Sequence, residues 1–249
     1  MYNRISTSKG YIKYRVQYKN VKNVTLRIEN IDVCLVTCPI TYPLDKIEKI
    51  VLDYSDKLHS KINANKNILE NYFMNNKLFF LGREYTYNLV KAKRNSVVVK
   101  NGIITFNLTS LDFSQLEKAI DRLYLSYSSR YMNDIFLEVL DEIKISNIKK
   151  EDKDKIIGKD IKIEYKKVKS YWGKCIIKED TIVINSRLLA FPKDVIKSVF
   201  FHELAHFLAS GHGKYFYQKL YKLYPEYDKH NHILSNSIIS NFIRLLFNK

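Results

Sequence analysis

One segment, residues 192–212, constrains the fold more than any other part of the chain. At helical spacing it has a broad apolar surface, formed by Val195, Ile196, Val199, Phe200, Leu204, Phe207 and Leu208. A narrow polar strip interrupts that surface and consists of Ser198, His202, Glu203, His206 and Ser210. We expect a helix this apolar to be buried. Burying two imidazoles and a carboxylate costs free energy unless a partner satisfies them, and a metal ion is such a partner.

The polar strip has the spacing of a metal site. His202 and His206 lie four residues apart, so both imidazoles project from one helix face and can bind the same ion. Glu203 lies beside them, where its carboxylate can act as a general base towards a metal-bound water. A catalytic zinc ion usually has three protein ligands and one open position. We predict His212 as the third ligand, because Gly211 favours the left-handed conformation that reverses a chain after a helix.

The same five-residue pattern also occurs as ordinary polar residues on surface helices. The flanking sequence argues against that alternative, since Pro192 suits the first turn of a helix and Asp194 adds the negative charge favoured there. We place the end of the helix at residues 210–211 and a second helix after it. His230 and His232 alternate in a polar segment that we interpret as a solvated loop, with a supporting contact to a ligand as the alternative.

Composition indicates a soluble, globular protein. Hydrophobic residues make up 46% of the 249 and charged residues 27%, and no stretch approaches the roughly 20 apolar residues of a membrane span. The polar N-terminus has no secretion signal and three cysteines argue against a disulfide framework, so we expect a cytoplasmic protein without membrane contact. The formal net charge of +16 is compatible with weak, non-specific nucleic-acid binding. Sequence-specific binding is not expected, because the basic residues are mostly lysine and are spread along the chain.

Hydrophobic periodicity predicts an α+β fold with two units. The first, residues 1–110, is small and rich in short β-branched and aromatic runs. We expect its strands over residues 11–18, 23–29, 32–38, 78–81, 85–90, 97–100 and 103–108. The Asn101-Gly102 pair is a strong signal for a hairpin turn. Residues 44–58 follow helical spacing instead.

The second unit, residues 111–249, contains the predicted metal site. It begins with a long helix, for which Ser114 and Glu117 form a capping box. The polar residues 147–160 are interpreted as a solvated loop. Further strands are expected over 161–168, 171–177 and 181–184, and an added amphipathic helix over 233–249.

Trp172-Gly173-Lys174-Cys175 lies just upstream of the predicted metal-binding helix. An extended peptide can bind as an added strand along a sheet edge beside a metal, so this segment is a candidate lining for a substrate cleft. The alternative is structural, with Trp172 as a core aromatic residue and Gly173 as a bulge.

Together these residues resemble the YgjP-like zinc metallopeptidase family, which is related to the SprT-like metalloproteases. Trp172-Gly173-Lys174-Cys175 is similar to the family's Trp-Gly-Ser-Cys signature, and the His-Glu-x-x-His motif with His212 matches its metal motif. Weaker agreement in the first unit includes Cys38-Pro39. Two departures affect the expected substrate cleft: Lys174 replaces a serine, and Tyr217 stands where the family often has tryptophan.

The resemblance implies a zincin-like C-terminal unit with one Zn²⁺ per chain and a protein or peptide substrate. His202, His206 and His212 would bind the metal, Glu203 would be catalytic, and Trp172, Gly173, Lys174 and Tyr217 would contact the substrate. The same resemblance raises a second hypothesis, a metal-dependent UTP pyrophosphohydrolase, although the chain has no glycine-rich phosphate loop. A third hypothesis is a non-catalytic binding module in which zinc is structural.

Overall fold

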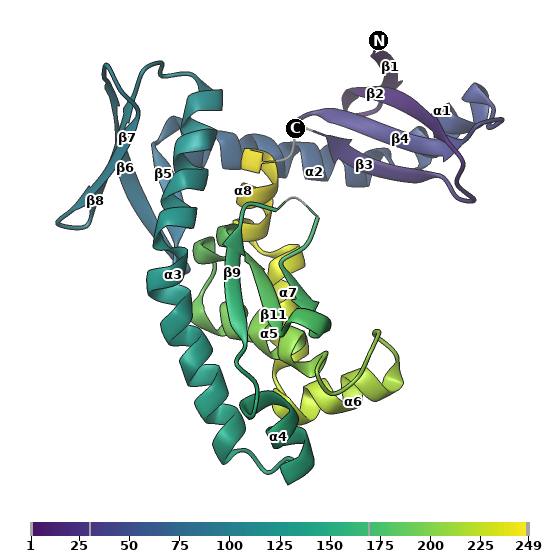
Figure 1. The fold of residues 1–249 in the computed structure, drawn as a ribbon. Coiled ribbons are helices and arrows are strands. Elements are labelled where there is room, and N and C mark those ends of the chain that lie inside the picture. Colours follow the sequence, from purple (N-terminus) through teal and green to yellow (C-terminus); the bar gives the residue numbers. More distant parts are fainter. Residues whose placement is uncertain (1, 30, 169, 248–249) are drawn as a thin grey trace. The chain divides into compact units, whose positions relative to one another are not determined.

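The computed structural model describes residues 2–29, 31–168 and 170–247 (Figure 1). The described residues combine α-helices with three small sheets, which confirms the predicted α+β class. Their contacts group into two compact units, one made of residues 1–75 with 244–249 and the other of residues 76–243. The division of the chain into two domains after residue 110 stays a prediction from the sequence.

The first unit contains one mixed sheet with the strand order β1-β2-β4-β3. Its strands are β1 (Asn3–Thr7), β2 (Gly10–Lys19), β3 (Thr25–Glu29) and β4 (Val33–Pro39). Strands β2 and β4 run parallel, and the other neighbours are antiparallel. Strand β1 was not predicted, because its residues are mostly polar; it forms by pairing with β2 along its whole length.

Two helices complete the core of the first unit, α1 (Leu44–Asp53) and α2 (Ser55–Ile68), followed by the π-helical turn η1 (Leu69–Met74). The helical structure predicted over residues 44–58 is confirmed, although it breaks at Tyr54 and then extends beyond residue 58. The core consists of Ile12, Tyr14, Cys34, Val36, Cys38, Ile47, Val51 and Leu58. All three cysteines of the chain are free, and those in this core act as small apolar residues.

The second unit begins with a sheet of strand order β5-β6-β8-β7. The strands are β5 (Lys77–Phe80), β6 (Arg83–Lys91), β7 (Ser96–Lys100) and β8 (Ile103–Leu108). Asn101 and Gly102 have φ angles of 51° and 75°, which confirms the predicted hairpin turn. The turn between β5 and β6 attaches this sheet to the rest of the unit, because the amides of Leu81 and Gly82 donate to carbonyls of residues 189 and 190 at 2.6 and 3.1 Å.

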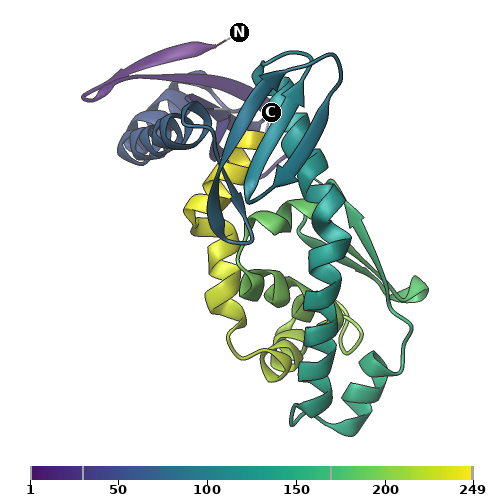
Figure 2. The same cartoon turned by 90° about the vertical axis from the view of Figure 1, so that its left-hand side faces the viewer.

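The longest helix, α3 (Phe113–Ile145), runs beside β9 (Lys162–Lys166), α5 (Lys193–Ala205) and the 3₁₀ segment η3 (Ser186–Ala190) in the second unit (Figures 1 and 2). Its N-cap is Asp112, which accepts a hydrogen bond from the Gln115 amide at 2.9 Å, so the predicted capping box at Ser114 is wrong. Helix α4 (Lys150–Ile157) follows where a solvated loop was predicted. The helix forms there because Ile156 is fully buried, a tertiary contact that the charged sequence around it conceals.

The second unit contains another sheet, of strand order β10-β11-β9, which precedes the helix with the histidines in the sequence. Its strands are β9 (Lys162–Lys166), β10 (Gly173–Ile176) and β11 (Thr181–Asn185), with the 3₁₀ turn η2 (Ile177–Glu179) between the last two. The central strand β11 is buried along its length, parallel to β9 and antiparallel to β10. The side of β10 that faces away from β11 is therefore an edge of this sheet.

Helix α5 (Lys193–Ala205) packs against α3, β10, α6 (Lys214–Leu223) and α7 (Tyr227–Asn236). Its apolar residues are almost completely buried, which confirms the expectation of a core helix. The predicted final helix over residues 233–249 is in fact two helices, α7 and α8 (Ile238–Phe247), that break at Ser237. Among the described residues, no helix is both long enough and apolar enough to cross a membrane.

Gly82 is predicted to be essential for the contact between the β5–β6 turn and α5. A Cβ atom there would lie 2.6 Å from Pro192 Cγ and 2.8 Å from its Cα, and the φ angle of +74° already disfavours other residues. Gly102 is a matched control, with φ of +75° and nothing within 4 Å. Gly102→Ala should cost about 1–2 kcal/mol of unfolding free energy, and Gly82→Ala about 1–3 kcal/mol more. Denaturant unfolding followed by circular dichroism measures both; equal losses would contradict the close approach.

Candidate metal centre and active site

Three histidine side chains converge at the C-terminal end of α5. His202 lies in its last turn and His206 caps it, while His212 follows a chain reversal. That reversal uses Gly211, whose φ is +69°. The ligand nitrogens of the three side chains all lie within 4.8 Å of one another. The Nε2 atoms of His202 and His212 are 3.0 Å apart, close to the roughly 3.3 Å expected for two nitrogens on one tetrahedral zinc ion. The donor set therefore fits a divalent metal ion such as zinc.

Helix α5 ends earlier than predicted, at Ala205 rather than at residues 210–211. The next residues continue in tight turns, in which the amides of His206, Phe207 and Leu208 donate to carbonyls three residues back at 3.0–3.3 Å. Such 3₁₀-type bonds are common in the last turn of a helix. The tightened turn changes the local backbone and still leaves His206 with His202, at a ring-centroid distance of 5.2 Å.

Two aromatic residues from later helices hold the imidazoles in place. The hydroxyl oxygen of Tyr227, on α7, lies 2.9 Å from Nδ1 of His202, so the contact engages that nitrogen and leaves Nε2 directed at the other histidines. Phe216, on α6, packs with ring-centroid distances of 5.0, 4.6 and 4.9 Å to His202, His206 and His212. A contact that fixes the second ring nitrogen is typical of metal-binding histidines. Sequence reasoning gave Tyr227 no role, because no spacing rule relates residues 25 positions apart.

The environment keeps the imidazoles of His202 and His206 neutral. Burial, together with the neighbouring rings of His206 and His212, lowers the pKa of His202 to about 4. Burial and the nearby His212 also lower the pKa of His206. A neutral imidazole has the lone pair that a metal ion binds, so these two rings are in the metal-binding form at pH 7.

The Glu203 carboxyl group lies between α5 and strand β10. The residue is only 5% exposed. It occupies the space that a side chain at Gly173 would fill, since a Cβ there would lie 2.5 Å from Glu203 Oε1. Burial raises the pKa of Glu203 to about 7, and a hydrogen bond from the Cys175 amide opposes that rise. Burial also raises the pKa of the Cys175 thiol, to about 12, so this cysteine stays protonated.

Of the four residues predicted to contact the substrate, two line a cavity beside the metal site and two do not. Trp172 and Gly173 line a cavity of about 170 Å³ that also borders the metal-site residues of α5. Lys174 is exposed on β10 and does not line that cavity. Tyr217 is half-buried on α6, where its ring packs against Phe216 at 5.4 Å, and it also lies outside the lining.

Cavity size alone would place the candidate active site in another part of the chain. A larger groove of about 840 Å³ lies in the first unit, among residues such as Leu26, Ile50 and Tyr54. No histidine, cysteine or glutamate lines it. The chemistry therefore identifies the smaller cavity as the candidate site.

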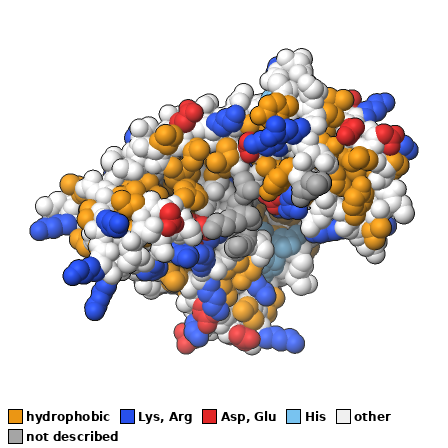
Figure 3. All heavy atoms as spheres, turned by 90° about the horizontal axis from the view of Figure 1, so that it is seen from above, with side chains coloured by type: hydrophobic (Ala, Val, Ile, Leu, Met, Phe, Trp, Pro, Cys, Tyr) orange, Lys and Arg blue, Asp and Glu red, His pale blue; other side chains and the backbone are white. Residues whose placement is uncertain are grey.

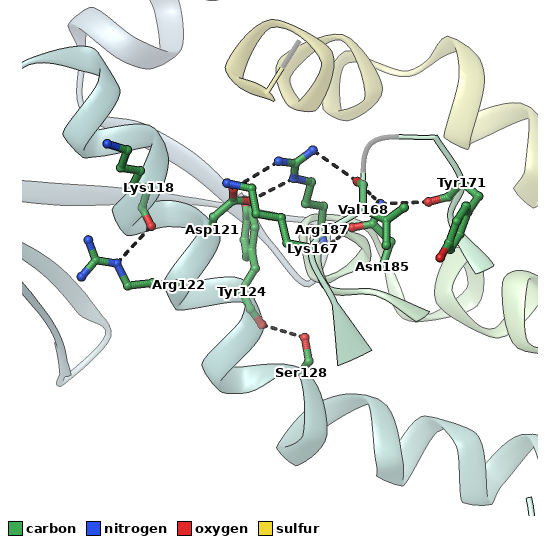
Figure 4. A network of polar contacts seen from close by, with 10 residues as sticks. All are labelled: Lys118, Asp121, Arg122, Tyr124, Ser128, Lys167, Val168, Tyr171, Asn185 and Arg187. Carbon is green, nitrogen blue, oxygen red and sulfur yellow. Dashed lines mark hydrogen bonds and ion pairs between the residues drawn. The ribbon is translucent and has the colours of Figure 1, made fainter. Parts of the chain in front are cut away.

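A buried polar network holds the segment that leads into β10 (Figure 4). Arg187 and Asp121, each about 95% buried, form a two-point ion pair with distances of 2.9 and 3.1 Å, and Lys167 also pairs with Asp121. The amide of Asn185 donates to the carbonyls of Val168 and Tyr171 at 2.8 and 3.0 Å. Its own backbone N–H donates to the carbonyl of residue 172 at 2.8 Å. The network thereby fixes the backbone directly before the glycine that contacts Glu203.

The interpretation of His230 and His232 as part of a solvated loop is wrong. Both lie on α7, and His230 is only 6% exposed, with its Nδ1 atom 2.9 Å from the hydroxyl of Tyr224. His232 is exposed and lies within hydrogen-bonding distance of Asn236. The helix was missed because polar residues hide its apolar face, which Tyr227 and Leu234 form.

A histidine triad beside a buried glutamate, on an α+β scaffold, is typical of metal-dependent hydrolases. The chain belongs to the YgjP-like family, since residues 22–237 match the YgjP-like metallopeptidase domain. It is thus a metallopeptidase, which acts on proteins or peptides. A comparison with curated proteins found no similar sequence. Among solved structures, the metallopeptidase zymogen of Pyrococcus abyssi abylysin is similar at 19% identity and a TM-score of 0.32, covering 41% of this chain and 91% of that chain.

Gly173 is predicted to set the position of the Glu203 carboxylate. Gly173→Ala would place a Cβ atom inside the space that this carboxylate occupies, so the glutamate must move. A displacement of about 1 Å in a catalytic group can cost about 100-fold in rate. Peptidase activity should fall by that order, while bound metal and unfolding temperature change little. Gly213→Ala is the control, because a Cβ there meets nothing within 4 Å. Unchanged activity in Gly173→Ala would show that the glutamate does not need this position.

Proposed function

We propose that the protein is a zinc-dependent peptidase in which His202, His206 and His212 bind one zinc ion and Glu203 is the general base. The observation that carries the proposal is the convergence of three imidazole nitrogens within 4.8 Å, directly beside a buried carboxylate. Neutral imidazoles are common zinc ligands, and three of them form a usual set for a catalytic site.

The number of ligands favours a catalytic site over a structural one. Structural zinc sites usually have four protein ligands, whereas catalytic sites keep one position open. Among the described residues, the candidate metal-binding group around α5 comprises the three histidines alone. His230 and His232, the two histidines that follow His212 in the sequence, both have other partners on or near α7. This arrangement argues against the non-catalytic binding module.

The residues of the chain have separable roles in the proposed reaction. Zinc, when bound, lowers the pKa of a water ligand and polarises the scissile carbonyl. Glu203 accepts a proton from the attacking water and then donates it to the departing amine nitrogen. Tyr227 keeps the Nε2 atom of His202 directed at the metal through its contact with Nδ1. The outer edge of β10 offers backbone groups to which an extended peptide can add as a strand.

A peptide suits the site better than a nucleoside triphosphate. None of the residues that line the cavity beside Glu203 is lysine or arginine, so a triphosphate would find no cation there. The cavity volume of about 170 Å³ is also below the roughly 300–1,000 Å³ of pockets that enclose whole small molecules.

On the face that Figure 3 shows, Lys and Arg side chains are scattered among acidic and hydrophobic ones and do not form a continuous basic patch. Weak nucleic-acid binding therefore gains no support from this surface. The cytoplasmic location stays a prediction from the sequence.

Replacing Glu203 with Gln is the direct test of the proposed mechanism. The amide keeps the shape of the side chain and cannot accept a proton, so cleavage of an unfolded protein substrate should fall by about 10²–10⁴-fold. Bound zinc, measured by elemental analysis, should not change. Glu226→Gln is the matched control, because this glutamate is exposed on the surface, at 59%, and should leave cleavage intact.

Cleavage by Glu203→Gln at the wild-type rate would exclude the general-base role. Release of pyrophosphate from UTP that is lost in Glu203→Gln, without any peptide cleavage by the wild type, would instead favour the pyrophosphohydrolase hypothesis.

A further inference from the structure

One face of α7 forms a wall of the cavity beside the metal-site residues. Tyr227, Asn231 and Leu234 all line the cavity, and their spacing of four and then three residues places them on a single face of the helix. We call this cavity the α7 pocket. His202 and Glu203 also line this cavity, so whatever enters the α7 pocket lies beside the proposed general base.

The walls of the α7 pocket are mainly apolar. Val199, on α5, and Leu234 are 5% and 6% exposed, so both are part of the packed interior around the pocket. Trp172 completes the apolar lining and is held edge-on against Phe191 at a ring-centroid distance of 5.2 Å. Asn231 is half-buried and is the one carboxamide in the lining. The only carboxylate there is that of Glu203.

The size of the pocket suits one side chain. An apolar cavity of about 150 Å³ can hold a benzene-sized molecule, and the α7 pocket has about 170 Å³. A leucine, methionine or phenylalanine side chain therefore fits. An acidic side chain would lose its hydration and face the carboxylate of Glu203, and both effects oppose its entry.

We propose that the α7 pocket binds an apolar side chain of a residue that flanks the scissile bond, so that α7 determines the sequence preference of the peptidase. This inference rests on the proposed function, because it assumes that peptide bonds are cleaved beside Glu203. It adds Leu234, Asn231 and Val199 as residues that determine specificity. None of these three residues was predicted from the sequence to contact the substrate.

The test is a cleavage profile of the zinc-loaded protein on a proteome-derived peptide library, with the residues on both sides of each cleaved bond identified by mass spectrometry. The wild type should favour Leu, Met or Phe over Asp and Gly at one of the two flanking positions by tenfold or more. Leu234→Ala enlarges the pocket and should shift the preference towards Trp and Tyr. The matched control is Leu223→Ala, since Leu223 is also 6% exposed and does not line the pocket.

Asn231→Phe is a second variant that does not remove core packing, because Asn231 is only half-buried. Its ring should fill the pocket and shift the preference to Gly and Ala. Cleavage without an apolar preference, or a profile that neither variant changes, would overturn the specificity assignment and leave the proposed function standing. Failure of the zinc-loaded wild type to cleave any peptide would overturn the proposed function, and the pocket assignment with it.

Discussion

The Glu203 carboxyl group is buried against the backbone of β10, and the rest of the site depends on that contact. A buried carboxylate is costly unless it is hydrogen-bonded or charge-paired, and here the Cys175 amide donates to it. The approach is close enough that residue 173 has no room for a Cβ atom. Glu203, His202 and the capping residue His206 share one strip of an otherwise apolar helix, so the packing of α5 that buries Glu203 also directs both imidazoles towards the metal site.

The surrounding elements support this contact from two sides. On one side, Asn185 binds the carbonyls that precede Gly173, and the buried pair of Arg187 and Asp121 connects this segment to α3. On the other side, α6 and α7 supply the aromatic residues that pack against the imidazoles. Removing one partner of a buried ion pair is strongly destabilising, by about 3–5 kcal/mol. The long helix α3 therefore contributes to the site through Asp121.

The sequence was sufficient where a function depends on local spacing and insufficient where it depends on tertiary contacts. The four-residue spacing of His202 and His206 could be read directly, as could the glycine turn before His212. The role of Tyr227 could not be predicted from the sequence, because Tyr227 contacts His202 only through the packing of α7 against α5. Helix α4 and the buried His230 were missed for the same reason: polar residues dominate both segments, and a few buried contacts decide their structure. The α+β class followed from periodicity, whereas β1 needed its partner β2 to form.

We propose that three histidines hold one zinc ion with an open position beside Glu203. Elemental analysis of bound zinc in the wild type, in His212→Ala and in His232→Ala tests it most directly. His232 is the control, because it is exposed on α7 and does not belong to the converging group. We expect about one zinc per chain in the wild type and in His232→Ala, with a marked loss in His212→Ala. No zinc in the wild type after zinc is supplied, or equal zinc in His212→Ala and the wild type, would contradict it.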